Sequence, residues 1–274
     1  MKKHAIVTGG SAGIGLAVAK ELARRGYELT LISSNPVRLE RAQSQIAKEC
    51  GIDAATIAVD FADLDAVAAA GPAIGTGWDV LVNNAGIKIQ SDAAKSAQGH
   101  ERHMAVNHFA HFALTRYLLG SANQNARIVS VASFMARFAP HNLFESDESS
   151  TSQRYAASKL ANLAFALELD ERLAAAGRSI QSVAAHPGFT RAEPYGTKIT
   201  RFGEYLLAQN TAWGAKPVVA AATEAEPSTY TGPAIGELWG APKPAKINSL
   251  ALDPQWRAGF WARSEELTGI EFRF

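Results

Sequence analysis

The sequence predicts an α/β protein built on a single doubly wound parallel sheet, with helices on both faces of the sheet. Three observations lead to this fold class. Short apolar runs alternate with helical patterns, these runs are almost continuously apolar, and a glycine-rich turn follows the first of them. Strands of continuous apolar sequence are typical of parallel sheets that helices cover on both faces. Right-handed crossovers between such strands then produce the doubly wound arrangement.

The expected elements alternate along the chain in a regular order. Strands are expected at residues 4–7, 28–32, 54–59, 79–82, 127–131 and 180–184. Helices are expected at residues 14–25, 37–49, 104–119 and 155–176, and another follows residue 210. Residues 240–244 form an expected extended crossing segment. No linker rich in proline, glycine or serine divides the chain, so we interpret residues 1–274 as one domain.

Two stretches interrupt the alternation. Residues 137–153 are polar and are interpreted as a surface insertion. Residues 191–210 lie between a strand and a later helix and carry several aromatic residues. Long irregular segments of compact domains are often lids or binding loops. We therefore expect residues 191–210 to form a lid over a substrate pocket, with an amphipathic core helix as the alternative.

Charge and cysteine content narrow the functional class. The formal net charge is +1 over 274 residues, which gives no sign of a nucleic-acid surface. Cys50 is the single cysteine, so no internal disulfide is expected. The sequence has no recognisable signal peptide and no apolar stretch of membrane-spanning length. We expect a cytoplasmic protein without a membrane span or a nucleic-acid partner.

The glycine-rich turn is a candidate phosphate site because it follows a strand and opens a helix. A helix N-terminus offers unpaired N–H groups and a partial positive charge to a pyrophosphate, as in Rossmann-type folds. Glycine lets the backbone approach such a ligand closely. The spacing differs from Gly-x-Gly-x-x-Gly, and a turn without a ligand remains the alternative. The expected cofactor-binding residues of this turn are Gly9, Ser11, Ala12, Gly13, Ile14 and Gly15.

The end of the second strand favours NADP(H) over NAD(H). Folds that prefer NAD usually place an acid there for the ribose 2′-OH. This chain instead has hydroxyls, an amide and a guanidinium, which suit a 2′-phosphate. The residues concerned are Ser33, Ser34, Asn35 and Arg38. An alternative is that Ser34 and Asn35 only cap the following helix, ahead of Pro36.

A tyrosine and a lysine form a candidate acid–base pair. Tyr155 and Lys159 are four residues apart, which places them on one face of a helix. A free tyrosine has a pKa of about 10, and a nearby ammonium lowers it toward the range that proton transfer needs. Ser133 at the end of the fifth strand supports this reading over a surface tyrosine and lysine.

These motifs, in this order, resemble those of the short-chain dehydrogenase/reductase family. The resemblance rests on residues 8–15, 83–86 and 155–159, on Asn107 and Ser133, and on the turn 186–188. Residues 106–112 and 158–162 resemble the retinol dehydrogenase-like and WW-domain oxidoreductase-like branch. The resemblance covers essentially the whole chain. It implies an NAD(P)-dependent oxidoreductase.

The resemblance also implies roles for individual residues. Tyr155 would exchange a proton with the carbonyl oxygen, Lys159 would lower the pKa of Tyr155 and bind the nicotinamide ribose, and Ser133 would hold the substrate oxygen. Asn107 would anchor a water that links Lys159 to solvent. The other implied cofactor contacts are Asp60, Phe61, Asn84, Ala85, Gly86, Pro187, Gly188 and Thr190. The usual carboxamide-binding threonine is replaced by Ala192, which puts anchoring by Thr190 in doubt.

The leading hypothesis is an NADP(H)-dependent oxidoreductase that acts on an apolar carbonyl or alcohol. Alternatives are a dinucleotide-binding sensor or scaffold without turnover, and a lyase or epimerase on the same fold. The resemblance implies a possible homodimer through the helices of Asn107 and Tyr155. The insertion at 137–153 could block this contact, so the oligomeric state is left open. No metal site is expected, since His100 and His103 lack the spacing of a zinc motif.

Overall fold

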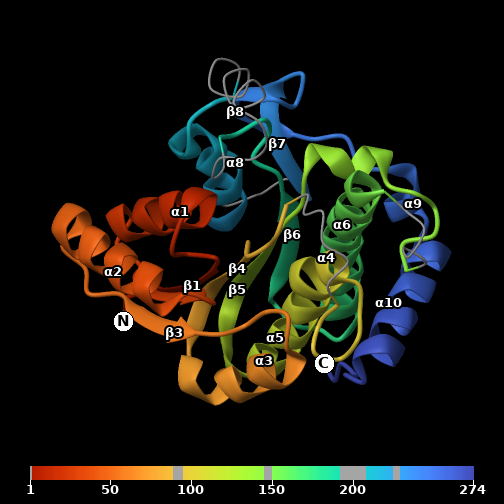
Figure 1. Cartoon of the computed structure of the whole chain (residues 1–274), viewed down its shortest axis with the longest axis horizontal. Helices are drawn as coiled ribbons and strands as arrows, with labels where there is room; N and C mark the ends of the chain where they lie inside the picture. Colours follow the sequence, from red (N-terminus) through yellow and green to blue (C-terminus); the bar gives the residue numbers. More distant parts are fainter. Residues whose placement is uncertain (1, 89–94, 145–149, 192–207, 225–228) are drawn as a thin grey trace.

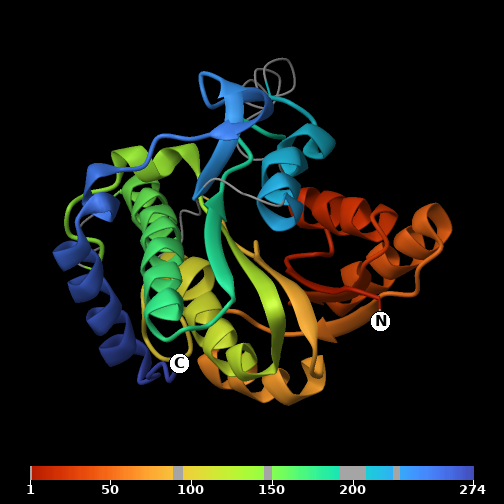
Figure 2. The same ribbon diagram turned by 180° about the vertical axis from the view of Figure 1, so that it is seen from behind.

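A single sheet of eight strands organises the chain, in the order β3-β2-β1-β4-β5-β6-β7-β8. The computed structural model describes residues 2–88, 95–144, 150–191, 208–224 and 229–274. Within these ranges all neighbouring strands are parallel except β7 and β8, which are antiparallel. Helices lie on both sides of the sheet (Figures 1 and 2). The predicted doubly wound α/β fold is confirmed.

The bounds of strands β1 to β6 agree with the six expected strands to within a few residues, and the largest difference is at the start of β5. They are β1 (His4–Thr8), β2 (Glu28–Ser33), β3 (Ala55–Ala58), β4 (Trp78–Asn83), β5 (Ala122–Val131), β6 (Gln181–Ala185), β7 (Tyr230–Ile235) and β8 (Trp239–Pro244). The β7–β8 hairpin is absent from the sequence-based prediction, which had only an extended segment at 240–244. Its prolines lack a backbone N–H and are tolerated because β8 is an edge strand and β6 pairs with β7 only through Tyr230 and Thr231.

Each face of the sheet buries its own apolar cluster. One cluster joins alternate strand residues to α1 (Gly13–Arg24), α2 (Pro36–Cys50) and α8 (Thr211–Thr223). The other joins the opposite strand residues to α3 (Leu64–Ala70), α5 (Ala110–Leu118), α6 (Thr151–Ala175) and α10 (Pro254–Thr268). Shorter elements are η1 (Gly71–Ile74), α4 (Arg102–Met104), the π-helical η2 (Ala105–Phe109), η3 (Leu119–Ser121), η4 (Phe134–Phe138) and α9 (Ser249–Leu252).

Local capping explains where two of the long helices begin. The Asn35 side chain accepts a hydrogen bond from the Arg38 amide at 3.0 Å, and Pro36 occupies the first turn of α2. Ser150 and Gln153 form a capping box at the start of α6. The box starts α6 at Thr151, four residues ahead of Tyr155, so the position of Tyr155 on α6 is set by local sequence.

The C-terminal helix α10 covers the outer faces of α5 and α6. Trp261 of α10 is fully buried and lies 5.1 Å from the Phe112 ring and 5.7 Å from the Phe165 ring, measured between centroids. The buried Arg257 of α10 pairs with Glu168 of α6 at 3.3 Å. These contacts bury large aromatic surfaces and fix α10 against the helices that carry Asn107 and Tyr155.

The segment 137–153 differs in part from the surface insertion that its polarity suggests. Its Leu143 is 3% exposed, and Phe144 stacks between Phe109 and Phe260 at 6.2 and 5.7 Å. Residues 145–149, like 192–207 of the expected lid, lie outside the described residues. Among the helices that the structure describes, none combines the length and the apolar character needed to cross a membrane.

Candidate active site

The candidate site residues follow the carboxyl ends of five neighbouring strands. The glycine-rich turn follows β1, Ser33 ends β2, Asn84 follows β4, Ser133 follows β5, and Pro187 follows β6. Because parallel strands end at the same edge of a sheet, these segments lie along one rim. The strand order reverses between β1 and β4, and ligands of open α/β sheets bind at such a switch point.

Thr8 connects the turn after β1 with the turn after β4. Its hydroxyl oxygen accepts hydrogen bonds from the amides of Asn84 and Ala85 at 2.8 and 2.9 Å. The Asn84 side chain in turn donates to the Thr8 carbonyl at 2.8 Å. The two motifs are therefore joined by direct hydrogen bonds, as expected for two walls of one groove.

The glycine-rich turn has the shape of an anion cradle. A Cβ on Gly15 would lie 2.3 Å from the Gly9 carbonyl oxygen, so only glycine allows this close approach. Gly13 has a φ of +55° and faces open space, in which a Cβ would meet no atom within 4 Å. Ala12 caps α1 without a side-chain hydrogen bond, so the first amides of this helix are left for a ligand. These residues fit a dinucleotide pyrophosphate.

The end of β2 places polar side chains beside the cradle. Ser11 of the turn donates a hydrogen bond to the hydroxyl of Ser33 at 2.8 Å. Ser34, Asn35 and Arg38 are exposed. Asn35 caps α2, as the alternative reading of the sequence proposed, and Ser33 and Ser34 remain the nearer candidates for a 2′-phosphate.

Asp60 and Phe61 follow β3 and differ in their surroundings. Asp60 is exposed and accepts a hydrogen bond from the Ala62 amide at 2.9 Å. The side chain of Phe61 is 5% exposed and packs 5.3 Å from the His111 ring in the core. Contact of Phe61 with an adenine, which the resemblance implies, would thus involve its backbone and stays a prediction.

Asn107 lies in the π-helical turn η2 and is fully buried. Its side chain accepts from the Ile87 amide at 2.8 Å and donates to the Ile87 carbonyl at 3.1 Å and to Ser158 at 2.9 Å. A Cβ on Gly86 would lie 2.9 Å from the Asn107 amide oxygen and 3.4 Å from the Lys159 nitrogen. Asn107 thus ties the loop after β4 to α6. π turns are frequent at functional sites.

Ser133 and Tyr155 are joined by a side-chain hydrogen bond. Ser133 caps η4, and its hydroxyl oxygen also accepts from the Met135 amide at 3.2 Å. Burial raises the pKa of Tyr155, and the bond to Ser133 opposes that rise. The sequence argument expected a lowered pKa from Lys159. The structure differs because the phenol is desolvated and the lysine nitrogen points to a backbone carbonyl.

Lys159 is 5% exposed, and its nitrogen donates to the Val131 carbonyl at 3.0 Å. That nitrogen lies 5.9 Å from the centroid of the Tyr155 ring. Burial, with a smaller contribution from the charge of Lys88, lowers the pKa of Lys159 from 10.5 to about 8. The described structure therefore brings together the four predicted catalytic residues Asn107, Ser133, Tyr155 and Lys159.

The turn after β6 carries Pro187, Gly188 and Thr190. The Thr190 hydroxyl donates to the Pro187 carbonyl at 2.7 Å, so this hydroxyl is already engaged. Thr190 pairs with Gln209 in a parallel bridge, which uses the backbone groups of Phe189 and Arg191. The N–H and C=O of Thr190 itself face away from Gln209 and are the groups of this residue that suit a carboxamide.

His111, which the sequence analysis does not single out, makes two polar contacts in the structure. Its Nδ1 lies 2.9 Å from the Asn107 carbonyl, and its Nε2 lies 2.9 Å from the Thr8 hydroxyl. A carbonyl only accepts, so Nδ1 carries the proton and Nε2 accepts from Thr8. Burial lowers the pKa of His111 to about 4, in agreement with a neutral ring. Its position four residues after Asn107 was the available signal.

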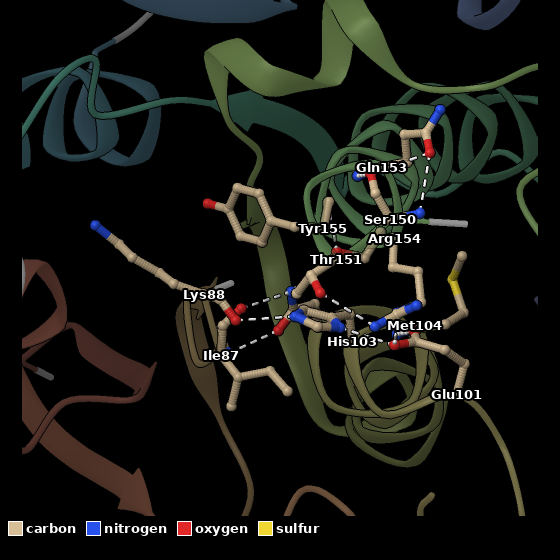
Figure 3. A network of polar contacts seen from close by, with 12 residues as sticks. Ile87, Lys88, Glu101, His103, Met104, Ser150, Thr151, Gln153, Arg154 and Tyr155 are labelled. Atoms are coloured by element: carbon tan, nitrogen blue, oxygen red, sulfur yellow. Dashed lines mark hydrogen bonds and ion pairs between the residues drawn. The ribbon is translucent and has the colours of Figure 1, made fainter. Parts of the chain in front are cut away.

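A second network, shown in Figure 3, lies beside Tyr155, and its His103 ring is 6.4 Å from the Tyr155 ring, measured between centroids. Glu101 contacts His103 at 2.7 Å and Arg154 at 3.4 Å, and it caps α4 through the Met104 amide at 2.8 Å. The other nitrogen of His103 lies 2.9 Å from the Lys88 carbonyl. Figure 3 shows the Tyr155 ring and the Lys88 side chain extending to the same side of this network. Sequence reasoning considered His103 only as a metal ligand and missed its contacts with Glu101 and Lys88.

Comparison with known proteins gives related sequences over most of the chain. Residues 3–200 match the short chain dehydrogenase family. The chain is 34% identical to retinol dehydrogenase 12 of Bos taurus over 200 residues, which are 70% of this chain and 62% of that relative, so less than two thirds of the relative is matched. It is 32% identical to the polyprenol dehydrogenase of Mus musculus, over 97% of this chain and 83% of the relative.

Solved structures give the same result. An uncharacterised protein from Mycobacterium paratuberculosis superposes with a TM-score of 0.84 at 32% identity, over 99% of this chain and 95% of that one. A short chain dehydrogenase from Burkholderia cenocepacia in complex with NADP has a TM-score of 0.64 at 28% identity, over 81% and 91%. The order of the motifs, the sheet topology and these matches agree. The chain belongs to the short chain dehydrogenase family.

Proposed function

We propose that this protein is an NADP(H)-dependent oxidoreductase that moves a hydride between nicotinamide and an apolar carbonyl or alcohol. The observation that carries the proposal is the hydrogen-bonded pair of Ser133 and Tyr155 beside the buried ammonium of Lys159. Ser133 follows β5 on the rim that also carries the anion cradle. Tyr155 and Lys159 come from α6, and the Lys159 nitrogen reaches the carbonyl of Val131, the last residue of β5.

The chemistry of the proposed reaction divides between the cofactor and the chain. The nicotinamide supplies or accepts the hydride. Tyr155 gives its phenolic proton to the substrate oxygen during reduction and removes it during oxidation. Ser133 donates a hydrogen bond to that oxygen, where negative charge develops. Lys159 holds the ammonium next to the phenol, and Asn107 holds the loop after β4 against both.

The preference for NADP(H) rests on the end of β2. Ser33 and Ser34 stand where an acidic residue would repel a 2′-phosphate, and the exposed Arg38 follows within one turn. The hydrogen bond from Ser11 brings the Ser33 hydroxyl against the pyrophosphate cradle. The NADP complex of the related Burkholderia cenocepacia enzyme supports the same choice.

The apolar substrate class rests on the side chains around Ser133. Phe134 and Met135 follow Ser133 directly in η4, and Phe189 follows Gly188 in the turn after β6. The names of the relatives, retinol dehydrogenase and polyprenol dehydrogenase, point to the same class. The proposed lid at 191–210 lies mostly outside the described residues, so its contribution stays a prediction.

A panel of carbonyl compounds and alcohols, incubated with NADPH or NADP⁺, tests the proposed function. We expect NADPH to be consumed in stoichiometric amounts with bulky apolar aldehydes or ketones, as read from nicotinamide absorbance. Cofactor binding without turnover across the panel would favour a sensor or scaffold. Substrate conversion without net change in the cofactor would favour a lyase or epimerase.

The assembly and location of the chain complete the proposal. Because α10 covers the outer faces of α5 and α6, a homodimer would have to use another surface. Sedimentation of the purified protein gives its mass in solution. We keep the cytoplasmic location as part of the proposal, and fractionation of the native cells tests it.

A further inference from the structure

The tip of the β7–β8 hairpin holds a glutamate in an unusual backbone conformation. Glu237 has a φ of +59°, in the left-handed region that residues other than glycine and asparagine rarely adopt. Among the described non-glycine residues, only Asn125 shares this feature. Such outliers persist where the surrounding structure holds them, and they gather at functional sites. The conformation turns the Glu237 side chain inward, where it is 18% exposed.

Inside the protein, Glu237 contacts two side chains, one in η4 after β5 and one in the turn after β6. One carboxylate oxygen forms an ion pair with Arg137 of η4 and accepts from the Lys246 amide. The other oxygen lies 3.4 Å from Nε2 of His186, within ion-pair range but without hydrogen-bond geometry. His186 is fully buried, and a Cβ on Gly232 would overlap its ring.

The protonation of His186 follows from its neighbours. The Gly188 amide donates to Nδ1 of His186 at 3.3 Å, so Nδ1 accepts and the ring proton lies on Nε2, facing Glu237. Burial lowers the pKa of His186, which keeps the ring neutral. The carboxylate therefore lies between one cation, Arg137, and one neutral imidazole, His186.

Each partner of Glu237 is close in sequence to a residue of the proposed site. Arg137 lies in η4, the helical turn that Ser133 caps, and His186 directly precedes Pro187 and Gly188. The same hairpin makes two further contacts with the turns after β5 and β6. Tyr230 donates from its hydroxyl to the Ser133 carbonyl at 3.3 Å, and the Leu238 carbonyl accepts from the Phe189 amide at 3.0 Å.

We propose that Glu237 is a positioning residue, which sets the separation of Ser133 from the turn at Pro187 and Gly188 by holding Arg137 and His186 at once. This proposal rests on the proposed function, with the substrate oxygen at Ser133 and the expected cofactor contacts at Pro187 and Gly188. Glu237 acts through its two partners and makes no contact with substrate. The proposed reaction would depend on the relative placement of these two turns, since one carries the proposed cofactor contacts Pro187 and Gly188 and the other carries Ser133, the proposed donor to the substrate oxygen.

Two substitutions separate this role from simple stabilisation of the hairpin. Glu237→Gln keeps the size of the side chain but removes its charge. Glu237→Gly removes the carboxylate and also relieves the left-handed backbone, so the hairpin is retained or strengthened. We expect kcat to fall about tenfold to a hundredfold in both variants, because small misplacements of reacting groups have effects of this size. The dissociation constant of NADPH, from its fluorescence, should change less than threefold.

A double-mutant cycle shows whether the effect runs through Arg137. If it does, Glu237→Gln combined with Arg137→Met lowers kcat no further than the worse single variant. The matched control is Glu168→Gln, which removes a buried carboxylate from its arginine partners Arg257 and Arg172 on the α6–α10 side. This control should lower the melting temperature and leave kcat unchanged.

The outcomes separate the two levels of the argument. Wild-type kcat in Glu237→Gly, measured beside an inactive Tyr155→Phe, would overturn the positioning role and leave the proposed function standing. Full turnover by Tyr155→Phe would instead overturn the site on which the proposal rests. Additive losses in the double-mutant cycle would show that Glu237 does not act through Arg137.

Discussion

The nitrogen of Lys159 donates a hydrogen bond to the carbonyl of Val131, the last residue of β5, at 3.0 Å. The same carbonyl accepts from the Asn162 side chain at 3.1 Å, so two residues of α6 are fixed to the strand that leads to Ser133. This bond keeps a lysine with almost no solvent contact in place beneath Tyr155. The ammonium of Lys159 loses its proton more easily than in water, because one carbonyl replaces only part of its hydration.

The first prediction is that carbonyl reduction declines as the pH rises through about 8, the pKa to which burial lowers Lys159. Below that value the lysine is charged and supports Tyr155, and above it the charge is lost. A pH profile of kcat/KM with NADPH and an aldehyde measures this limb. A rate that is constant from pH 7 to 10 would show that the Lys159 charge has no part in the reaction.

Burial of the Lys159 charge also lowers the stability of the fold, and stability therefore rises with pH over the range in which the reduction rate declines. Its pKa is lower in the folded chain than in the unfolded one, so the cost of burying the charge is fully present below about pH 8 and is relieved as the pH rises toward 10.5. Lys159→Met should therefore raise the free energy of unfolding at pH 7 by about 1–3 kcal/mol while it abolishes turnover. Urea unfolding of both proteins at pH 7 and 10 makes the comparison, and the gain should shrink at pH 10.

The second prediction concerns Tyr155. Tyr155→Phe removes the hydroxyl but keeps the ring, so turnover should fall by about 10²–10⁴-fold, the usual contribution of a general acid or base. NADPH binding should remain nearly intact. Steady-state rates and a fluorescence titration of NADPH give the two quantities, and Tyr117→Phe, at an exposed position on α5, serves as the control. Near-normal rates would remove Tyr155 from the mechanism.

The third prediction is that the wild-type protein prefers NADP(H) and that Ser33→Asp reverses this preference. The new carboxylate would repel a 2′-phosphate and accept from a free 2′-OH. It would also change the contact with Ser11, so Ser33→Ala is the matched control that removes the hydroxyl without adding charge. The ratio of kcat/KM with the two cofactors decides, and a wild-type ratio in favour of NAD(H) contradicts the prediction.

The fourth prediction is that acid weakens the fold through two buried histidines. Burial lowers the pKa of His108 to about 3 and that of His111 to about 4, so the unfolded chain takes up protons first as the pH falls below 6.5. Each histidine then removes up to about 3 kcal/mol of stability by pH 4. Urea unfolding at pH 7 and 4.5 measures the loss. It should be smaller in His108→Leu, relative to that variant's own stability at pH 7.

The sequence was a good guide where function and local pattern coincide. The strands up to β6, the capping of α2 by Asn35 and the helix of Tyr155 follow from apolar runs and short motifs. The resemblance located Asn107, Ser133, Tyr155 and Lys159, which the structure brings together. These features depend on residues close in sequence, or on motifs with a fixed order.

The sequence was a poor guide where long-range contacts decide. The β7–β8 hairpin contains prolines that argue against a strand, and only its position at the sheet edge allows them. Glu237 is an ordinary acidic residue in the sequence, and its partners Arg137 and His186 are far from it along the chain. The Phe61 side chain packs in the core although its neighbour Asp60 is exposed. No local pattern separates these cases.

The closure between Thr190 and Gln209 has a consequence for how this protein can change. The Arg191 amide donates to the Gln209 carbonyl, and the Gln209 amide donates to the Phe189 carbonyl, at 2.9 and 3.0 Å. The Gln209 side chain also donates a hydrogen bond to the Pro187 carbonyl at 2.7 Å. These bonds join residues 189–191 to Gln209 and do not depend on how many residues lie between them. Loop closure costs little more as a loop lengthens. The proposed lid can therefore vary in length and composition between species or in engineered variants, while the bonds among Phe189, Arg191 and Gln209 at its base stay the same.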